Sequence, residues 1–337
     1  GNETSITAVM PTGTDNQTTA YIYGGFASGA LQSNDLLRLV EYPDKDTGEA
    51  STSSSDDVAT TYDQLGEVLT KTDQNSSIHT YSYDTLGRMI LDAITTLGSG
   101  VDDSILAIGT TYNTQGLIDT ITSYSDDTAT TVANQIKRTY NGLGQMITEY
   151  QEHNGAVDTG SSYYVAYAYD TLAHGARAIS MRYPNGAELD YNYGTADGLN
   201  DVISRLDNIS EDSQTLESYQ YLGLGTVVVR TQGETGISLT YIKQGSESNG
   251  DAGDKYTGLD RFGRVVDQRW IDSSGTDVDR YQYTYDDDGN VTAKTNTLNS
   301  ALDETYTYNS LNQLTAVTRN GTAYQSWVLD ALGNMLS

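Results

Sequence analysis

Tyrosine recurs at every second position in several short stretches of the chain, and small or polar residues separate the tyrosines. These stretches are Tyr81/Tyr83, Tyr167/Tyr169, Tyr191/Tyr193, Tyr219/Tyr221, Tyr281/Tyr283/Tyr285 and Tyr306/Tyr308. Ser82, Gln220 and Thr284 are examples of the residues in between. A period of two places alternate side chains on opposite faces of a β-strand. The pattern therefore predicts short strands that have a tyrosine face and a polar face.

A turn signal follows most of these strands: Tyr, then Asp or Asn, two variable residues, and Gly. The clear copies are Tyr62-Asp63 with Gly66, Tyr83-Asp84 with Gly87, Tyr112-Asn113 with Gly116, Tyr140-Asn141 with Gly144, and Tyr285-Asp286 with Gly289. Asp or Asn at the first corner and Gly at the fourth are typical of a type I turn. A glycine with positive φ, acting as a bulge residue, would then close a β-hairpin with a short loop.

The turn signal returns at intervals of 21 to 38 residues once degenerate copies are included. Such a period indicates a repeat protein, in which one supersecondary unit is copied along the chain. We assign residues 60–337 to the repeat array and residues 1–59 to a poorly matching, β-rich lead-in of degenerate repeats. Because Leu336 and Ser337 fall in the second strand of a repeat, we expect the array to continue beyond the chain end.

Composition changes this picture in one respect, the thickness of the sheet. Only 36% of the residues are apolar, and tyrosine supplies 27 residues whereas phenylalanine and tryptophan supply two each. A layer of tyrosines keeps its hydroxyl groups near water or backbone, which favours a thin sheet over a packed sandwich. The predicted fold class is all-β: an array of antiparallel β-hairpins that forms a continuous spiralling sheet, either shell-like or a solenoidal shaft.

The charge of the chain limits its partners. The net charge is −28, with only 18 Lys and Arg residues, and contacts to phosphate need those side chains. Nucleic acid and anionic membranes are therefore not expected as partners. The sequence also contains no apolar run long enough to span a membrane, and no cysteine for disulfides or thiol chemistry.

The repeated residues resemble the YD repeat of the Rhs/teneurin-like family, in which Tyr-Asp-x-x-Gly is followed by Arg or Asn. The best copies are Tyr83-Asp84-Thr85-Leu86-Gly87-Arg88 and Asp330-Ala331-Leu332-Gly333-Asn334. The resemblance covers about residues 60–337. It implies a long spiralling sheet of hairpins, which in several family members encloses a hollow shell, and a role outside the cytoplasm or in delivery to another cell. The Asp-Pro-x-Gly-Leu core motif of the family is absent from this sequence.

No motif in the chain is typical of catalysis. There is no Gly-x-Ser-x-Gly elbow, no phosphate-binding loop and no His-Glu-x-x-His helix. We therefore predict that the chain is not an enzyme and has no catalytic or cofactor-binding residues. His79, His153 and His174 share no spacing and are interpreted as solvated loop residues.

Asp286, Asp287 and Asp288, which precede Gly289, are weak candidates for binding calcium. In a calcium loop of the EF-hand type, however, glycine stands at the sixth position and a glutamate at the twelfth. Here the glycine comes at the fourth position and the glutamate is missing. A solvated acidic turn is therefore the preferred interpretation, with weak calcium binding as the secondary one.

These observations predict an extracellular structural protein, a segment of a bacterial surface fibre, stalk or adhesin located outside the cell or at its surface. Its partners would be further YD repeats of the same or identical chains, in a homo-oligomer or filament. Two alternatives stay open. One is a wall segment of an Rhs-type toxin-encapsulating shell. The other is a carbohydrate-binding surface module, in which tyrosine rings stack on surface glycans.

The turn assignment also predicts which glycines matter. Gly87→Val should be among the most damaging single changes, because a β-branched residue at positive φ costs about 1–3 kcal/mol. Gly155 and Gly250 lie in variable connections. They should tolerate alanine within about 0.5 kcal/mol.

Overall fold

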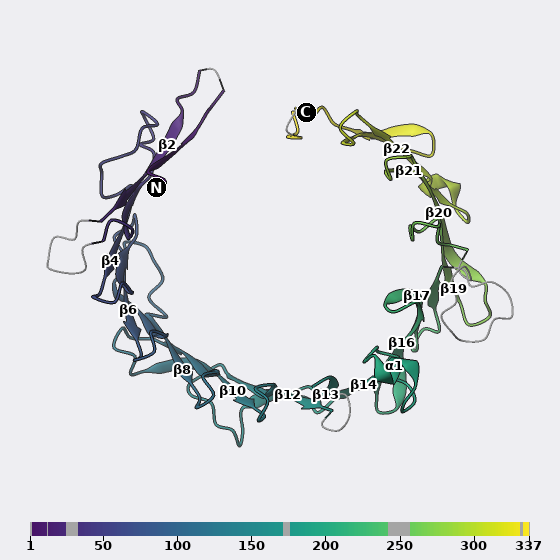
Figure 1. The fold of residues 1–337 in the computed structure, drawn as a ribbon, viewed down its shortest axis with the longest axis horizontal. Coiled ribbons are helices and arrows are strands. Elements are labelled where there is room, and N and C mark those ends of the chain that lie inside the picture. Colours follow the sequence, from purple (N-terminus) through teal and green to yellow (C-terminus); the bar gives the residue numbers. More distant parts are fainter. Residues whose placement is uncertain are drawn as a thin grey trace. The chain divides into compact units, whose positions relative to one another are not determined.

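The structure, a computed structural model, describes residues 2–11, 13–24, 33–170, 176–241, 257–330 and 333–336. Over these residues the chain forms 24 β-strands, one four-residue α-helix and one short 3-10 helix (Figure 1). Consecutive strands pair in the antiparallel sense and are joined as hairpins. The predicted fold class, an all-β array of antiparallel hairpins, is therefore confirmed.

The chain divides into two compact units, residues 1–166 and residues 167–337. The strands of unit 1 are β1 (Ser5–Ala8), β2 (Gln17–Tyr23), β3 (Leu37–Glu41), β4 (Asp57–Tyr62), β5 (Val68–Thr72), β6 (Ile78–Tyr83), β7 (Met89–Thr96), β8 (Ala107–Tyr112), β9 (Ile118–Tyr124), β10 (Val132–Tyr140), β11 (Met146–Glu152) and most of β12 (Tyr163–Tyr169). Each of these strands pairs with the next one in the sequence. The predicted lead-in, residues 1–59, supplies β1 to β3 and the start of β4.

Unit 2 has the same organisation. Its elements are β13 (Ala178–Arg182), β14 (Glu188–Asn192), α1 (Leu199–Val202), β15 (Asn208–Glu211), β16 (Gln214–Leu222), β17 (Thr226–Gln232), β18 (Ser238–Thr240), β19 (Asp267–Ile271), β20 (Asp277–Tyr285), β21 (Val291–Asn296), η2 (Ser300–Leu302), β22 (Glu304–Tyr308), β23 (Leu314–Arg319) and β24 (Thr322–Ser326). From β13 to β24 each strand again pairs with its neighbour in the sequence.

This meander gives each unit two rims. The tight turns that carry the repeat signature follow even-numbered strands, as between β4 and β5 or between β20 and β21. The connections of variable length follow odd-numbered strands, as between β11 and β12. In an antiparallel meander, successive connections lie at opposite ends of the strands. Within each unit the signature turns therefore share one rim, and the variable connections share the other.

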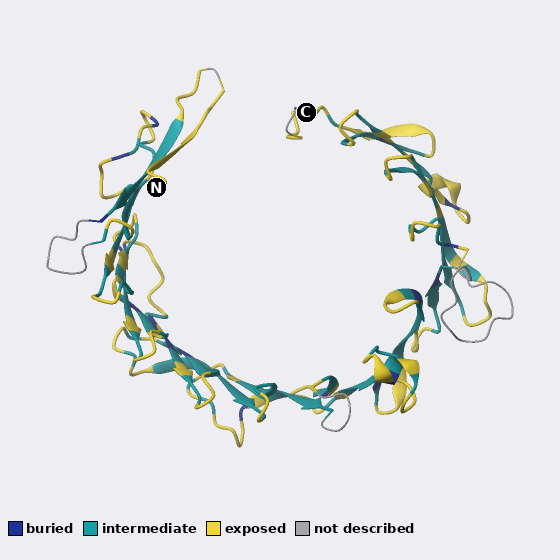
Figure 2. Cartoon of the chain, in the orientation of Figure 1, coloured by how far each residue is buried: buried dark blue, intermediate teal, exposed yellow. Residues whose placement is uncertain are grey.

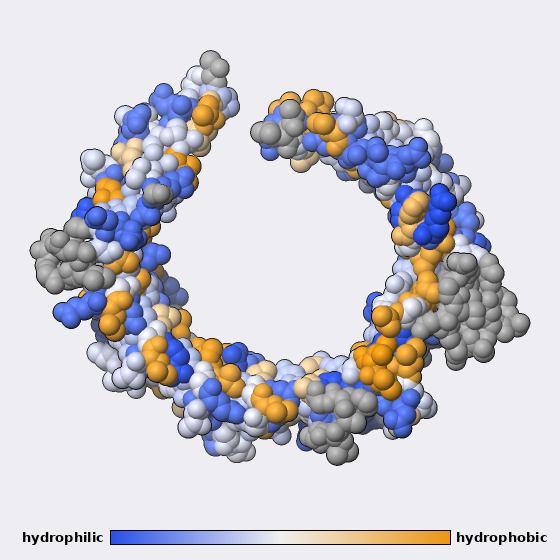
Figure 3. All heavy atoms as spheres, in the orientation of Figure 1, coloured by the Kyte–Doolittle hydropathy of each residue, from blue (hydrophilic) through white to orange (hydrophobic). Residues whose placement is uncertain are grey.

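The sheet is thin, and most strand residues are only half-buried (Figure 2). Among the described residues, the buried apolar side chains are Ala93, Ala107, Val228 and Val317. In the view of Figure 3, apolar residues form small groups among polar ones. A one-layer sheet leaves both faces near water, so stability has to come from contacts between neighbouring strands rather than from a central core.

The face opposite the motif tyrosines carries threonines that pair across strands. The hydroxyl of Thr61 lies 2.6 Å from that of Thr70, and the hydroxyl of Thr111 lies 2.7 Å from that of Thr120. Thr139 pairs with Thr148 in the same way. Each of these pairs begins at the residue directly before the motif tyrosine. Cross-strand hydroxyl pairs and β-branched side chains both stabilise a sheet.

Candidate functional site

The signature turn is held by its own first side chain. In the turn after β4, Asp63 Oδ1 accepts hydrogen bonds from the backbone N–H groups of Leu65 and Glu67, at 2.8 and 2.9 Å. The backbone N–H of Gly66 donates to the carbonyl of Asp63, and that of Asp63 donates to Glu67. These are the bonds of a hairpin with a three-residue loop, a type I turn and a bulge glycine. Asn113 and Asn141 make the same pair of bonds through Oδ1.

The turn glycines have positive φ. The values are +85° at Gly66, +75° at Gly87, +80° at Gly116, +78° at Gly144 and +90° at Gly289. A side chain at such a φ is strained, whatever space surrounds it. In two described copies of the turn, Asn312 and Gly263 stand at this place with φ of +59° and +77°. Asn is the non-glycine residue that accepts this conformation best.

In the described part of the chain, five motif tyrosines connect their repeat to the preceding one in the same way. Tyr83 donates its hydroxyl to the backbone carbonyl of Val68, at 2.9 Å, and Tyr140 donates to that of Ile118, at 2.8 Å. The acceptor is the second residue after the glycine of the previous turn. The same bond joins Tyr112 to Met89, Tyr285 to Val265 and Tyr308 to Val291. The tyrosine hydroxyl therefore ties one hairpin to the next.

The residue directly after the turn glycine reaches toward the turn of the next repeat. Arg88 is ion-paired with Asp84 at 2.6 Å, and its guanidinium lies 4.0 Å from the ring centre of Tyr112 in the following repeat. Arg264 repeats the arrangement with Asp260 and with the ring of Tyr285, at 4.4 Å. Cation–π contacts of this kind add to the packing of the ring. In the sequence this arginine stands out only as part of the family pattern, and nothing there reveals its contact with the ring.

Hydrogen bonding and burial act on the titratable groups of these junctions in opposite directions. The Arg88 side chain and the turn backbone hold the pKa of Asp84 below its usual value. Burial raises the pKa of Glu67, and the neighbouring carboxylate of Asp63 adds to this effect. Burial also raises the pKa of the tyrosine hydroxyls, including those of Tyr83 and Tyr285. Asp84 is therefore charged, and Tyr83 and Tyr285 are neutral donors, over the whole ordinary pH range.

The acidic turn at residues 286–290 has the same structural role as the other turns. Asp286 accepts from the backbone and side-chain amides of Asn290, at 2.8 and 3.0 Å, while Asp287 and Asp288 are exposed. Over the described residues, no three His, Cys, Asp or Glu side chains are placed so that they could hold a metal ion. The calcium hypothesis for Asp286, Asp287 and Asp288 thus gains no support from the structure.

The structure corrects the interpretation of one histidine. His79 lies on strand β6 rather than in a loop, and its Nδ1 is 2.7 Å from Oδ1 of Asp92 on β7. Its ring stacks beside Tyr81 on the same strand. His153 lies in the connection after β11. His174 and Gly250, like the turn residues Thr171, Leu172, Ala173, Ala331 and Leu332, lie outside the described residues.

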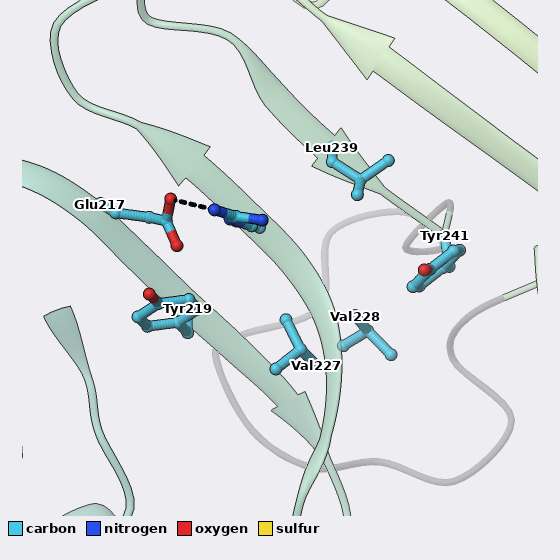
Figure 4. A pocket seen from close by; sticks show the side chains of 7 residues that line it. Glu217, Tyr219, Val227, Val228, Leu239 and Tyr241 are labelled. Carbon is cyan, nitrogen blue, oxygen red and sulfur yellow. Dashed lines mark hydrogen bonds and ion pairs between the residues drawn. The ribbon is translucent and has the colours of Figure 1, made fainter. Parts of the chain in front are cut away.

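A shallow hollow of about 450 Å³ lies over β16, β17 and β18 in unit 2 (Figure 4). Val227, Val228 and Leu239 line it together with the rings of Tyr219 and Tyr241. Glu217 and Arg230 form an ion pair of 2.6 Å at its margin. Burial, with a hydrogen bond to Glu217, raises the pKa of Tyr219 to about 12. These polar groups satisfy one another, so none points into the hollow as a free ligand.

Helices play a minor part in the described chain, and none of them has the length and apolar character needed to cross a membrane.

Known proteins share parts of this sequence pattern and fold. The RHS Repeat family model matches residues 285–323, which cover the end of β20 through the start of β24. No curated protein matches the chain. Among solved structures, the chain is similar to a chain of the Photorhabdus luminescens Tc holotoxin pore with a mutation in TccC3, at a TM-score of 0.58 and 15% identity over 95% of this chain. It also matches TcdB2-TccC3 at 14% identity over 95% of this chain, with a TM-score of 0.46.

The fold and its junctions define the class of protein. It is an array of β-hairpins in which a turn of the Tyr-Asp/Asn-x-x-Gly type recurs, and in which tyrosine hydroxyls join successive hairpins. Residues 285–323 match the RHS Repeat family, in agreement with the resemblance of the turns to that family. The chain spans 17% of the matched Tc holotoxin chain and 18% of the matched TcdB2-TccC3 chain.

Proposed function

We propose that the chain is a wall segment of an Rhs-type toxin-encapsulating shell, a structural and non-enzymatic element that acts outside the producing cell. The observation that supports this most is the likeness of 95% of the chain to a component of a Tc holotoxin. Of the functions that the sequence suggested, this one therefore replaces the fibre, stalk or adhesin as the preferred hypothesis.

The junctions between repeats suit a wall. A wall one sheet thick has to hold together without a central core. Tyrosine hydroxyls tie several repeats here to the preceding one, and Arg88 and Arg264, which follow turn glycines, contact the next repeat. The tyrosine rings are engaged in these contacts. Arg88, Arg177, Arg205 and Arg264 each lie over the ring of a motif tyrosine. A role of these rings in stacking on glycans has correspondingly less support.

Images of the native polypeptide that contains these repeats test the proposal. Negative-stain electron microscopy should show hollow, ellipsoidal particles. Filaments would contradict the shell and return the fibre to first place.

A protection experiment adds a matched control. A polypeptide enclosed by the native protein should resist protease. It should become sensitive when Gly87→Val and Gly144→Val disturb the wall at two positive-φ turns. Gly142→Ala changes the same turn as Gly144, at a position without positive φ and with open space around it. That variant should leave the protection intact. Equal sensitivity of all variants would contradict an enclosing wall.

A further inference from the structure

Large apolar side chains are exposed at one recurring position of the repeat. Among the described residues, ten large apolar side chains are more than 60% exposed. Six of these stand three residues after the motif tyrosine or after the residue in its place, as Leu65 does after Tyr62. They are Leu65, Leu86, Leu143, Leu224, Phe262 and Leu311, with exposures from 61% to 82%. We call them the tip residues. Single exposed apolar residues are ordinary, but a repeated position is not.

The turn itself does not need an apolar tip. Its backbone is held by the first side chain of the turn and by the positive φ of its last residue, and the tip side chain lies in solvent. Gln115 and Asp288 stand at the same position in two other repeats whose glycines also have positive φ. A polar residue is therefore compatible with the same turn. The apolar tips call for an explanation outside the hairpin.

Within each unit the tip residues lie along a single rim. Leu65, Leu86 and Leu143 follow β4, β6 and β10 in unit 1, and Leu224 and Leu311 follow β16 and β22 in unit 2. Successive signature turns are two strands apart, which is about 9.6 Å along the rim. The rim is thus a narrow strip with apolar points at a regular spacing.

The size of this strip indicates the kind of partner. From β4 to β11 it is about 34 Å long and about 10 Å wide, or roughly 340 Å². A stable interface between separate proteins buries about 800 Å² on each side. The strip is too small for such an interface, but it suits a partner that is tethered nearby, since tethering raises the effective concentration. A partner with the same repeat could meet every tip in register.

We propose that the tip residues pack against the rim of another tract of RHS repeats. Two neighbouring tracts of the wall would then be held together by contacts between their rims. The identity of this partner rests on the proposed shell function. This chain spans 17% of the matched holotoxin chain, so a chain of that kind is long enough to hold further tracts. A lipid surface is disfavoured by the net charge of −28 and by carboxylates such as Asp63 and Glu67 beside Leu65.

Disulfide trapping between copies of this chain tests the contact, because the chain has no cysteine of its own. Gln64→Cys places a thiol next to Leu65 on the tip rim, and Ser99→Cys places one on the opposite rim. Each copy of this chain is itself a tract of the repeats, and a high protein concentration takes the place of tethering. Under that condition Gln64→Cys should form intermolecular disulfides severalfold faster than Ser99→Cys. Adding Leu65→Gln, Leu86→Gln and Leu143→Gln should reduce the rate of Gln64→Cys to that of Ser99→Cys. Circular dichroism and thermal melting confirm that the variants are folded.

Equal rates at the two rims, or a rate that the three substitutions leave unchanged, would overturn the inference. Tip-dependent binding to phosphatidylcholine vesicles without tip-dependent trapping would also overturn it, in favour of a lipid contact. The same three substitutions in the native polypeptide separate this inference from the proposed function. Intact hollow particles would leave the shell standing and reject the role of the tips, whereas filaments from the unaltered protein would reject the shell itself.

Discussion

At the scale of single residues, glycine at the end of the signature turn has two reasons to be glycine. Its φ is positive, and a side chain of the previous repeat lies close to it. That side chain belongs to the residue directly after the turn glycine of the previous repeat. A Cβ on Gly87 would lie 2.7 Å from Oε1 of Glu67, and one on Gly144 would lie 3.4 Å from Cδ1 of Leu117. The Glu67 side chain is flexible and can move aside, so the backbone conformation is the stronger of the two constraints.

Two glycines of one turn make a matched pair for this argument. Gly144→Ala should lower the free energy of unfolding by about 1–2 kcal/mol, because alanine is strained at positive φ. Gly142→Ala should leave it unchanged or raise it by about 0.4–1 kcal/mol, because alanine restricts the unfolded chain. Denaturant titration of the two variants measures both effects. Equal losses at both positions would contradict the turn geometry.

Gly155 was expected to tolerate alanine because it lies in a variable connection, but its backbone conformation speaks against this expectation. Gly155 lies in a variable connection with open space around it, but its φ is +107°. Gly155→Ala should therefore be strained and lower the free energy of unfolding by about 1–3 kcal/mol, rather than be neutral. Thermal melting against the wild type decides, and an unchanged midpoint would restore the original expectation. Variability of a connection does not reveal the φ of its residues.

The hydroxyl of a motif tyrosine gives a second test at this scale. Tyr140→Phe removes the bond to the carbonyl of Ile118 and keeps the ring, so it should lower the free energy of unfolding by about 0.5–1.5 kcal/mol. Tyr163→Phe is the control, because Tyr163 is 71% exposed. If both variants melt like the wild type, the hydroxyl does not tie the repeats together.

At the scale of elements, the stability of a hairpin depends on its contacts with the neighbouring hairpins as well as on its own two strands. Arg88, in the hairpin of β6 and β7, lies over the ring of Tyr112 at the end of β8. Such contacts between neighbouring elements are the nearest-neighbour terms that hold a repeat array together. Isolated hairpins of this kind should be unstable, because a single two-stranded hairpin is marginal in water.

A double-mutant cycle measures this contact. Arg88→Ala and Tyr112→Leu, singly and together, should show a coupling of about 0.5–1 kcal/mol, the size of a partly exposed cation–π contact. Arg88→Ala combined with Tyr140→Phe is the control, because Tyr140 belongs to the next junction along the chain. Additive effects in the first cycle would mean that the arginine and the ring do not interact.

At the scale of the whole molecule, the tyrosines make stability sensitive to alkali. Burial raises the pKa of many of them in the folded chain, to about 12 at Tyr219, where a bond to Glu217 contributes. In the unfolded chain tyrosine ionises near pH 10. The unfolded state therefore loses protons first, and the stability that is present below about pH 10 is lost as the pH rises toward 12.

Denaturation at a series of pH values checks this expectation. The denaturation midpoint should be constant up to about pH 10 and then fall, in step with the absorbance of tyrosinate in the unfolded fraction. A midpoint that stays constant through that range would show that the hydroxyls are not held in the folded state.

The net charge of −28 predicts the response to salt. Like charges repel in the folded array, and at physiological ionic strength they are screened within about 8 Å. The melting temperature should therefore rise as sodium chloride is added. Calcium chloride at equal ionic strength is the control for Asp286, Asp287 and Asp288. A clearly larger rise with calcium would revive the calcium hypothesis, and no rise with either salt would exclude repulsion as a factor in stability.

The sequence by itself determined the local parts of this protein. Strands with a tyrosine face follow from a period of two, and the turns at Asp63, Asp84 and Asn141 follow from residues that are close in sequence and bond to one another. Antiparallel pairing of neighbours also follows, because a short turn allows little else. The resemblance to the RHS repeat could be seen in the sequence for the same reason, since the signature of that repeat is the turn.

Only the tertiary structure decided what connects one repeat to the next. The bond from Tyr83 to Val68 spans 15 residues, and the reach of Arg88 to Gly116 spans 28. Such contacts depend on the register of several strands, which a bulge beside each motif tyrosine shifts by one residue. The exposure of the tip residues could not be read from the sequence either. The same type of residue can be buried or exposed, and only the folded arrangement decides which.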